Sequence, residues 1–189
     1  MLCSCGRFQE TLAVHSAPAL LGVKAACLMS IDKDELDVYS SAESFNRRAA
    51  SKGLRIKILC ECNKRCLLLL YNSKLMDKLL ADPDRRRFLE GFGYSFDLDR
   101  EQCLDRLALR CADAGDFPHE IGVFLDYPPE DVRGFIEHRG SNYKLCGYWK
   151  VYGDADSACR TFQKYDKCRR FLCNKLNEGM DIYQALRIS

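Results

Sequence analysis

His119 and Glu120 are the residues of this sequence whose types and spacing best fit acid–base chemistry. They follow Pro118 in the stretch from Phe117 to Pro128, FPHEIGVFLDYP. Proline suits the first position of a helix, which predicts His119 and Glu120 in a first helical turn, where backbone N–H groups are unpaired and the helix dipole is positive. That environment favours a neutral imidazole, suited to proton transfer or to metal binding. The structural alternative is that Glu120 caps the helix and His119 lies on the surface.

The same stretch does not fit a zinc protease, because Val123 stands where the HExxH motif needs its second histidine. It also resembles a helix-turn-helix, with a second helix from Glu130 to His138. That helix begins with Glu130 and Asp131, and phosphates repel acidic side chains. Nucleic-acid binding is therefore the weaker interpretation.

The segment from His15 to Lys24, HSAPALLGVK, is a candidate anion-binding loop. Backbone N–H groups around Ser16 and Gly22, together with the ammonium of Lys24, are suited to hold a phosphate or a carboxylate. The segment is not a Walker A loop, because it lacks the GxxxxGK[ST] pattern. The alternative is that Lys24 only flanks the following strand.

Aromatic residues gather in Tyr148 to Tyr152, YWKVY, which includes the only tryptophan of the chain. In a strand, these side chains alternate between two faces. One face is expected to pack on the long helix that follows, and the other to line a pocket for a planar ligand. The candidate pocket residues are Tyr148, Trp149 and Lys150, with Tyr127 from the LDYP stretch; the alternative is a strand covered on both faces.

The 12 cysteines are the compositional oddity of the chain. Most fall where small apolar residues would stand, and we expect them to be reduced core thiols. A weaker hypothesis places Cys60, Cys62 and Cys66 in a three-thiol metal site across a hairpin turn, although the CxC spacing is a poor zinc chelate. Cys3 and Cys5 could bind a metal only together with a partner.

Composition and length are those of a globular protein. The chain has 189 residues, 47% hydrophobic and 30% charged, with a net charge of +2. This predicts one domain over residues 1–189 and gives no electrostatic reason to expect nucleic acid or an anionic membrane as a partner. No apolar run approaches the roughly 18 residues that span a bilayer, and no secretory signal is recognisable, so we expect a cytoplasmic protein.

The pattern of elements predicts an α+β fold with about four strands in a largely antiparallel sheet and about seven helices. Residues 54–62 and 65–71 form the clearest hairpin, and the second of these strands is nearly all apolar, which predicts a central position. Asp99 and Gln102 fit a capping box. The other expected strands are 26–31 and 143–152, and the expected helices include 7–14, 41–52, 73–80, 85–90, 100–113, 130–138, 155–178 and 182–186.

The motifs Pro118-His119-Glu120 and Leu125-Asp126-Tyr127-Pro128 resemble the PHE and LGYP motifs of the bacterial domain-of-unknown-function family 3793. Asp126 stands where the family has glycine. The segments SAPALLGVK and GYWKVYGD are also similar to the family, so the resemblance spans roughly residues 12–186. The family has no established activity; the resemblance implies a protein of anaerobic bacteria with a link to iron or redox physiology.

Two functional hypotheses follow. In the first, the protein binds a small ligand, or a metal or redox cofactor, in a pocket lined by the HSAPALLGVK loop, the PHE turn and the GYWK strand. His119 would be the proton carrier or ligand, Glu120 its partner, and Lys24 the anion anchor. In the second, the protein is a non-enzymatic adaptor or regulator of an iron or redox system, and the same motifs are structural. The cofactor, the partner and any enzymatic activity are not defined by the sequence.

Overall fold

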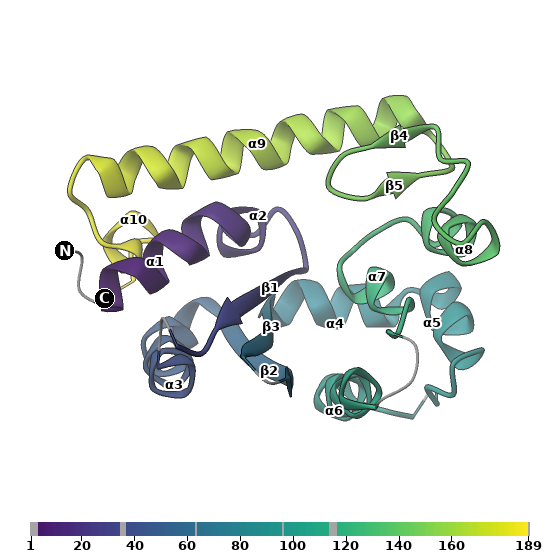
Figure 1. Cartoon of the computed structure of the whole chain (residues 1–189), viewed down its shortest axis with the longest axis horizontal. Coiled ribbons are helices and arrows are strands. Elements are labelled where there is room, and N and C mark those ends of the chain that lie inside the picture. Colours follow the sequence, from purple (N-terminus) through teal and green to yellow (C-terminus); the bar gives the residue numbers. More distant parts are fainter. Residues whose placement is uncertain (1–3, 35–36, 63, 96, 114–116, 189) are drawn as a thin grey trace.

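A three-stranded antiparallel sheet lies at the centre of the computed structural model (Figure 1), which describes residues 4–34, 37–62, 64–95, 97–113 and 117–188. The strands are β1 (Ala26–Asp32), β2 (Leu54–Cys62) and β3 (Arg65–Asn72), in the order β1-β3-β2. The predicted hairpin and the central position of its second strand are confirmed. Consecutive residues of β3 are buried on both faces of the sheet, since each face is covered by helices.

One layer of helices covers the face of the sheet that carries Leu68 and Leu70. This layer is built from two parts of the chain that lie far apart in sequence. The N-terminal α1 and α2 lie beneath the long α9, and Leu12 and Leu172 meet in their shared core (Figure 1). The elements of this layer are α1 (Ser4–His15), α2 (Ala17–Leu20), α3 (Val38–Arg48), the short 3₁₀ helix η1 (Ala49–Lys52), α9 (Ala155–Asn177) and α10 (Ile182–Ala185).

The second layer covers the opposite face, which carries Leu69 and Tyr71. It is continuous in sequence from the end of β3 to residue 137. Its elements are α4 (Ser73–Ala81), α5 (Pro83–Glu90), α6 (Arg100–Ala112), α7 (Ile121–Phe124) and α8 (Pro129–Glu137). The predicted capping box at the start of α6 is confirmed, because Asp99 accepts from the backbone of Gln102 and the Gln102 side chain accepts from the backbone of Asp99.

The expected fourth strand, residues 143–152, is wrong as a continuous strand. The chain there folds back into a separate two-stranded sheet of β4 (Leu145–Cys146) and β5 (Lys150–Val151). The cause is the approach of α9: a side chain at Gly147 would collide with the ring of Phe162, so the backbone turns at this glycine against the helix. The central sheet therefore has three strands, not four.

More helices are present than the expected number of about seven: the described part of the chain forms ten α-helices. One of the additional helices is α2, which lies inside the segment predicted as a loop and has Pro18 in its first turn. Within the described residues, no helix combines the length and the apolar character needed to cross a membrane.

Candidate functional site

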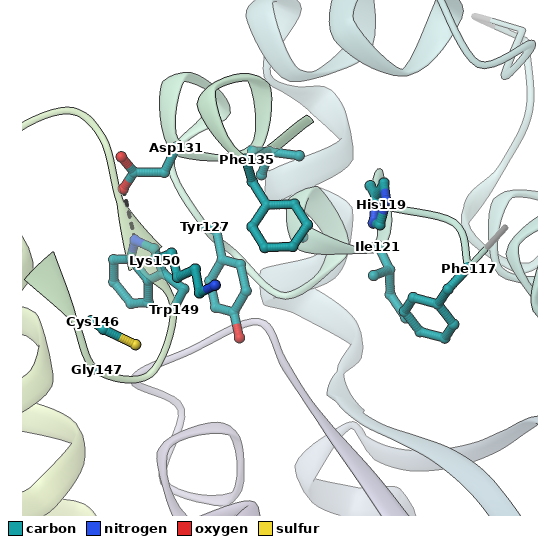
Figure 2. Close-up of a pocket in the computed structure, with 12 residues that line it drawn as sticks. Phe117, His119, Ile121, Tyr127, Asp131, Phe135, Cys146, Gly147, Trp149 and Lys150 are labelled. Carbon is teal, nitrogen blue, oxygen red and sulfur yellow. Dashed lines mark hydrogen bonds between the residues drawn. The ribbon is translucent and has the colours of Figure 1, made fainter. Parts of the chain in front are cut away.

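An aromatic cavity of about 360 Å³ lies between the turn at residues 117–122, helix α8 and the β4–β5 hairpin (Figure 2). The lining of the cavity is almost wholly apolar. Four aromatic rings and one imidazole contribute to its walls, with a lysine and a cysteine from the hairpin. The lining residues are Phe117, His119, Ile121, Gly122, Tyr127, Asp131, Val132, Phe135, Cys146, Gly147, Trp149 and Lys150.

Trp149 forms the floor of this cavity and packs against two aromatic rings. Its indole stacks on Tyr127 with ring centroids 4.9 Å apart, and it meets Phe162 of α9 edge to face at 4.5 Å. Only 9% of its surface is exposed. Such offset and edge contacts match the charge distribution of aromatic rings, so the tryptophan is fixed before any ligand arrives.

Asp131 fixes the hairpin to α8, and sequence reasoning missed it. It is 3% exposed, and its carboxylate accepts three hydrogen bonds of 2.7 Å, from the indole Nε1–H of Trp149 and from the backbone N–H groups of Tyr152 and Gly153. A buried carboxylate is stable only with such partners. The acidic start of α8 was interpreted only as a feature that repels phosphate, and no local signal in the sequence identifies Asp131, because its partners lie 18 to 22 positions later.

His119 lies at the mouth of the cavity, with its ring edge on to Phe135 at a centroid distance of 5.2 Å. It does not occupy a helical turn as predicted. Residues 118–120 form a turn that precedes α7, in which the backbone N–H of Ile121 bonds to the carbonyl of Pro118. The turn lies close to α8, because a side chain at Gly122 would be only 2.8 Å from Val132.

Glu120 points in the opposite direction from His119, into the second layer of helices. It is 0% exposed, and one carboxylate oxygen accepts from Nε of Arg110 on α6 and from the hydroxyl of Tyr94 at 3.4 Å. Burial, with the charge of Glu120 nearby, raises the pKa of Tyr94. The structure therefore does not bring His119 and Glu120 together as an acid–base pair.

Lys24 lies behind the cavity and does not line it. It is 4% exposed, with its ammonium 4.8 Å from the ring centroid of Tyr127 and 5.3 Å from that of Tyr165. Burial lowers the pKa of Lys24, and the nearby Cys27 and Asp126 act in the other direction and raise it. Burial also raises the pKa of Tyr127 to about 12. Tyr127 thus contacts the buried lysine and also lines the cavity.

The remaining residues of the predicted anion loop also lie outside the cavity. Ser16 is fully buried, and its hydroxyl contacts the sulfur of Met29 at 3.0 Å. Gly22 is exposed and adopts a left-handed conformation with φ of 69°, which suits glycine. The aromatic cavity is therefore not shared with this loop, although Val23 of the loop and Trp149 line another pocket.

Tyr148 and Lys150 point in different directions, although both belong to the predicted aromatic strand. Tyr148 points away to α9, where its hydroxyl donates to Asp166 at 2.9 Å; burial and that carboxylate raise its pKa to about 12. Lys150 points into the cavity, and its ammonium donates to the carbonyl oxygen of Gly140 at 2.7 Å. The two side chains point in different directions because the chain reverses at Gly147.

Cys60, Cys62 and Cys66 do not share a face of the sheet. Cys66 is paired with Glu61 and is buried in the same core as Leu68 and Leu70, whereas Cys60 is paired with Leu67 beyond a bulge in β2. Directly paired residues share a face and their neighbours lie on the other, which separates Cys66 from the CxC thiols. Cys3 and the side chain of Cys5 lie outside the described residues. Among those that are described, no group of three or more His, Cys, Asp or Glu residues could hold a metal ion.

Comparison with known proteins gives one family match. No curated protein and no solved structure matches the chain significantly. A family model described as "Protein of unknown function (DUF3793)" matches residues 12–186, which is nearly the whole chain and agrees with the resemblance found in the sequence. The match includes the turn at 117–122, α8 and the β4–β5 hairpin, and the chain belongs to the DUF3793 family.

Proposed function

We propose that the protein binds a small, flat, apolar molecule in the aromatic cavity. The observation that carries this proposal is the arrangement of Tyr127, Phe135 and Trp149 around about 360 Å³ of almost wholly apolar space. Ligand sites in proteins are concave and mostly apolar, with volumes from roughly 300 to 1,000 Å³ and a few polar groups that set orientation. Planar rings in the walls favour a planar ligand, because stacked and edge contacts need flat surfaces.

The rigidity of the walls supports the proposal. Trp149 is fixed by Asp131, Tyr127 and Phe162, so little side-chain freedom remains to be lost when a ligand binds. The Tyr127 hydroxyl donates to the carbonyl of Tyr148 at 3.2 Å, which ties Tyr127 to the hairpin turn. Preorganised walls of this kind increase affinity without additional contacts.

The acid–base and metal versions of the first hypothesis are not part of the proposal. Glu120 is engaged by Arg110 on the far side of the turn, so it does not act as the proton partner of His119. The cysteines support a cytoplasmic, reducing location: the ten whose side chains are described are free, and Cys27, Cys66, Cys103 and Cys168 are buried among core residues.

The test is a calorimetric titration of the protein with naphthylmethanol, a neutral, planar probe that fits the cavity. We expect saturable binding with one site. Replacing Phe135 by alanine removes one wall, and we expect affinity to fall about tenfold, the effect of losing one well-packed aromatic contact in a binding site.

The matched control is Phe171→Ala. Phe171 lies on α9, is 45% exposed and does not line the cavity. Its variant should bind naphthylmethanol as the wild type does. Absence of saturable binding to the wild-type protein, or equal losses in both variants, would reject the proposal.

A further inference from the structure

We infer that the molecule bound in the aromatic cavity carries a carboxylate, which pairs with the ammonium of Lys150. This inference rests on the proposed function and names the chemical class of its ligand: a planar aromatic carboxylate. It follows from the position of Lys150, from the charges that face the cavity, and from the hydrogen bonds that the lysine leaves unused.

Lys150 is half-buried, lines the cavity, and in Figure 2 its ammonium lies on the side of Phe135. It donates one hydrogen bond, to the carbonyl of Gly140 at 2.7 Å. An ammonium has three donors, so two remain for a ligand or for solvent. The ring centroids of Phe135 and Tyr143 lie 5.8 Å and 5.0 Å from Nζ, which surrounds the charge with aromatic faces.

No protein carboxylate neutralises this charge, as far as the described residues show: none of the ion pairs among them includes Lys150. The one carboxylate in the cavity wall, Asp131, directs its oxygens to the indole of Trp149 and to two backbone N–H groups. Both oxygens of this carboxylate are thus hydrogen-bonded within the protein. The charge offered to a ligand is positive, and the apolar walls strengthen its attraction for an anion.

Lys150 is anchored on the same side of the hairpin as its neighbour. Trp149 is fixed to α8 through Asp131, and the ammonium of Lys150 donates to Gly140, three residues beyond the end of the same helix. The hairpin therefore presents a flat ring and an ammonium side by side in the cavity. An aromatic acid has the complementary pair, a flat ring with an attached carboxylate.

A purely structural role for Lys150 makes a different prediction. If the lysine only satisfies the carbonyl of Gly140 beyond the end of α8, the cavity should not distinguish ligands by charge. The test is therefore a comparison of three probes with the same ring system, namely naphthoate, naphthylmethanol and protonated naphthylmethylamine, by calorimetric titration at neutral pH and low salt.

We expect naphthoate to bind about tenfold more tightly than naphthylmethanol, as for one hydrogen bond assisted by charge, and the cationic amine to bind more weakly than either. Equal affinities for naphthoate and naphthylmethanol would overturn the inference and leave the proposed function standing. Absence of binding by all three probes would reject both.

Variants of Lys150 test whether this residue causes the preference for naphthoate over naphthylmethanol. Lys150→Met keeps an apolar stem of similar length, and the ratio of its affinities for naphthoate and naphthylmethanol should fall to about one. Lys150→Arg should keep the preference. The control is Lys144→Met: Lys144 lies on the same hairpin and donates to the carbonyl of Gly153 at 2.8 Å, but it is exposed and outside the cavity. A preference for naphthoate that survives in Lys150→Met would contradict the inference.

Discussion

The indole N–H of Trp149 donates to the carboxylate of Asp131 at 2.7 Å, which joins the β4–β5 hairpin to helix α8. The other oxygen of the same carboxylate accepts from the backbone of Tyr152 and Gly153. One buried acid thus orients the tryptophan and holds the strand that carries it. The aromatic cavity depends on this contact, because its floor and one side wall come from the hairpin and its opposite wall from α8.

Asp131→Asn should lower the free energy of unfolding by about 2 kcal/mol, the usual cost of leaving a buried donor unsatisfied. The amide oxygen can still accept from the backbone of Tyr152 and Gly153, but the amide N–H₂ group would face the indole N–H of Trp149. Chemical denaturation measures the loss. Because Trp149 is the only tryptophan, its emission should also shift to longer wavelength as the indole becomes more exposed to water.

The control for this substitution is Glu137→Gln, an exposed acid in the last turn of the same helix. It should change stability by less than about 0.5 kcal/mol. Equal stability and unchanged emission in Asp131→Asn would show that the carboxylate does not hold the hairpin.

His119 and Glu120 should behave as unrelated residues when each is replaced by alanine. Glu120→Ala removes a fully buried carboxylate from Arg110, whose side chain is 38% exposed and can regain water. We expect a loss of about 2 kcal/mol, less than for a pair buried on both sides. His119→Ala should cost less than about 0.5 kcal/mol, because its side chain is exposed.

The measurement is again chemical denaturation, paired with titration by naphthylmethanol. His119→Ala should weaken binding at the mouth of the cavity without a loss of stability. Equal losses of stability in the two variants would contradict the buried position of Glu120 and the exposed position of His119.

Local signals in the sequence were sufficient for the central sheet. The polar pair Asn63-Lys64 in the sequence and the apolar run after it predict the hairpin, and Asp99 with Gln102 predicts the start of α6, because these signals depend on residues close in sequence. The family was also recognisable from motifs. The late strand was mispredicted because its turn depends on Phe162, a contact that no periodicity in residues 143–152 records.

The candidate site was only partly predictable, because some of its contacts join residues that are distant in the sequence. His119, Tyr127, Trp149 and Lys150 were identified from residue type and do meet in the cavity. The direction of Glu120 was not predictable, because its partner lies on α6, ten positions earlier in the chain. Asp131 was missed because its three partners lie 18 to 22 positions away.

Lys24→Met should stabilise the protein by about 1 kcal/mol at neutral pH. The substitution removes the cost of burying an ammonium, and the lost attraction to Tyr127 and Tyr165 offsets part of that gain. The control is Lys164→Met on the exposed face of α9, which should leave stability nearly unchanged.

The advantage of Lys24→Met should shrink as pH rises. The pKa of Lys24 in the folded state lies below its ordinary value of 10.5. Between those two values the unfolded chain binds more protons than the folded one, so the stability of the wild type rises with pH relative to the variant. Denaturation of both proteins from pH 7 upward checks this sign. A difference that stays constant or grows with pH would contradict the burial of the charged lysine.

The central claim, that the aromatic cavity is a ligand site, is tested most directly by nuclear magnetic resonance of the protein during titration with naphthoate. The single indole N–H signal, from Trp149, should shift in a saturable manner, together with backbone signals of Phe135, Cys146 and Lys150. Signals from the far end of α9, near Phe171, should not move. Saturable shifts confined to another part of the molecule, or no shift of the indole signal at saturating probe, would contradict the claim.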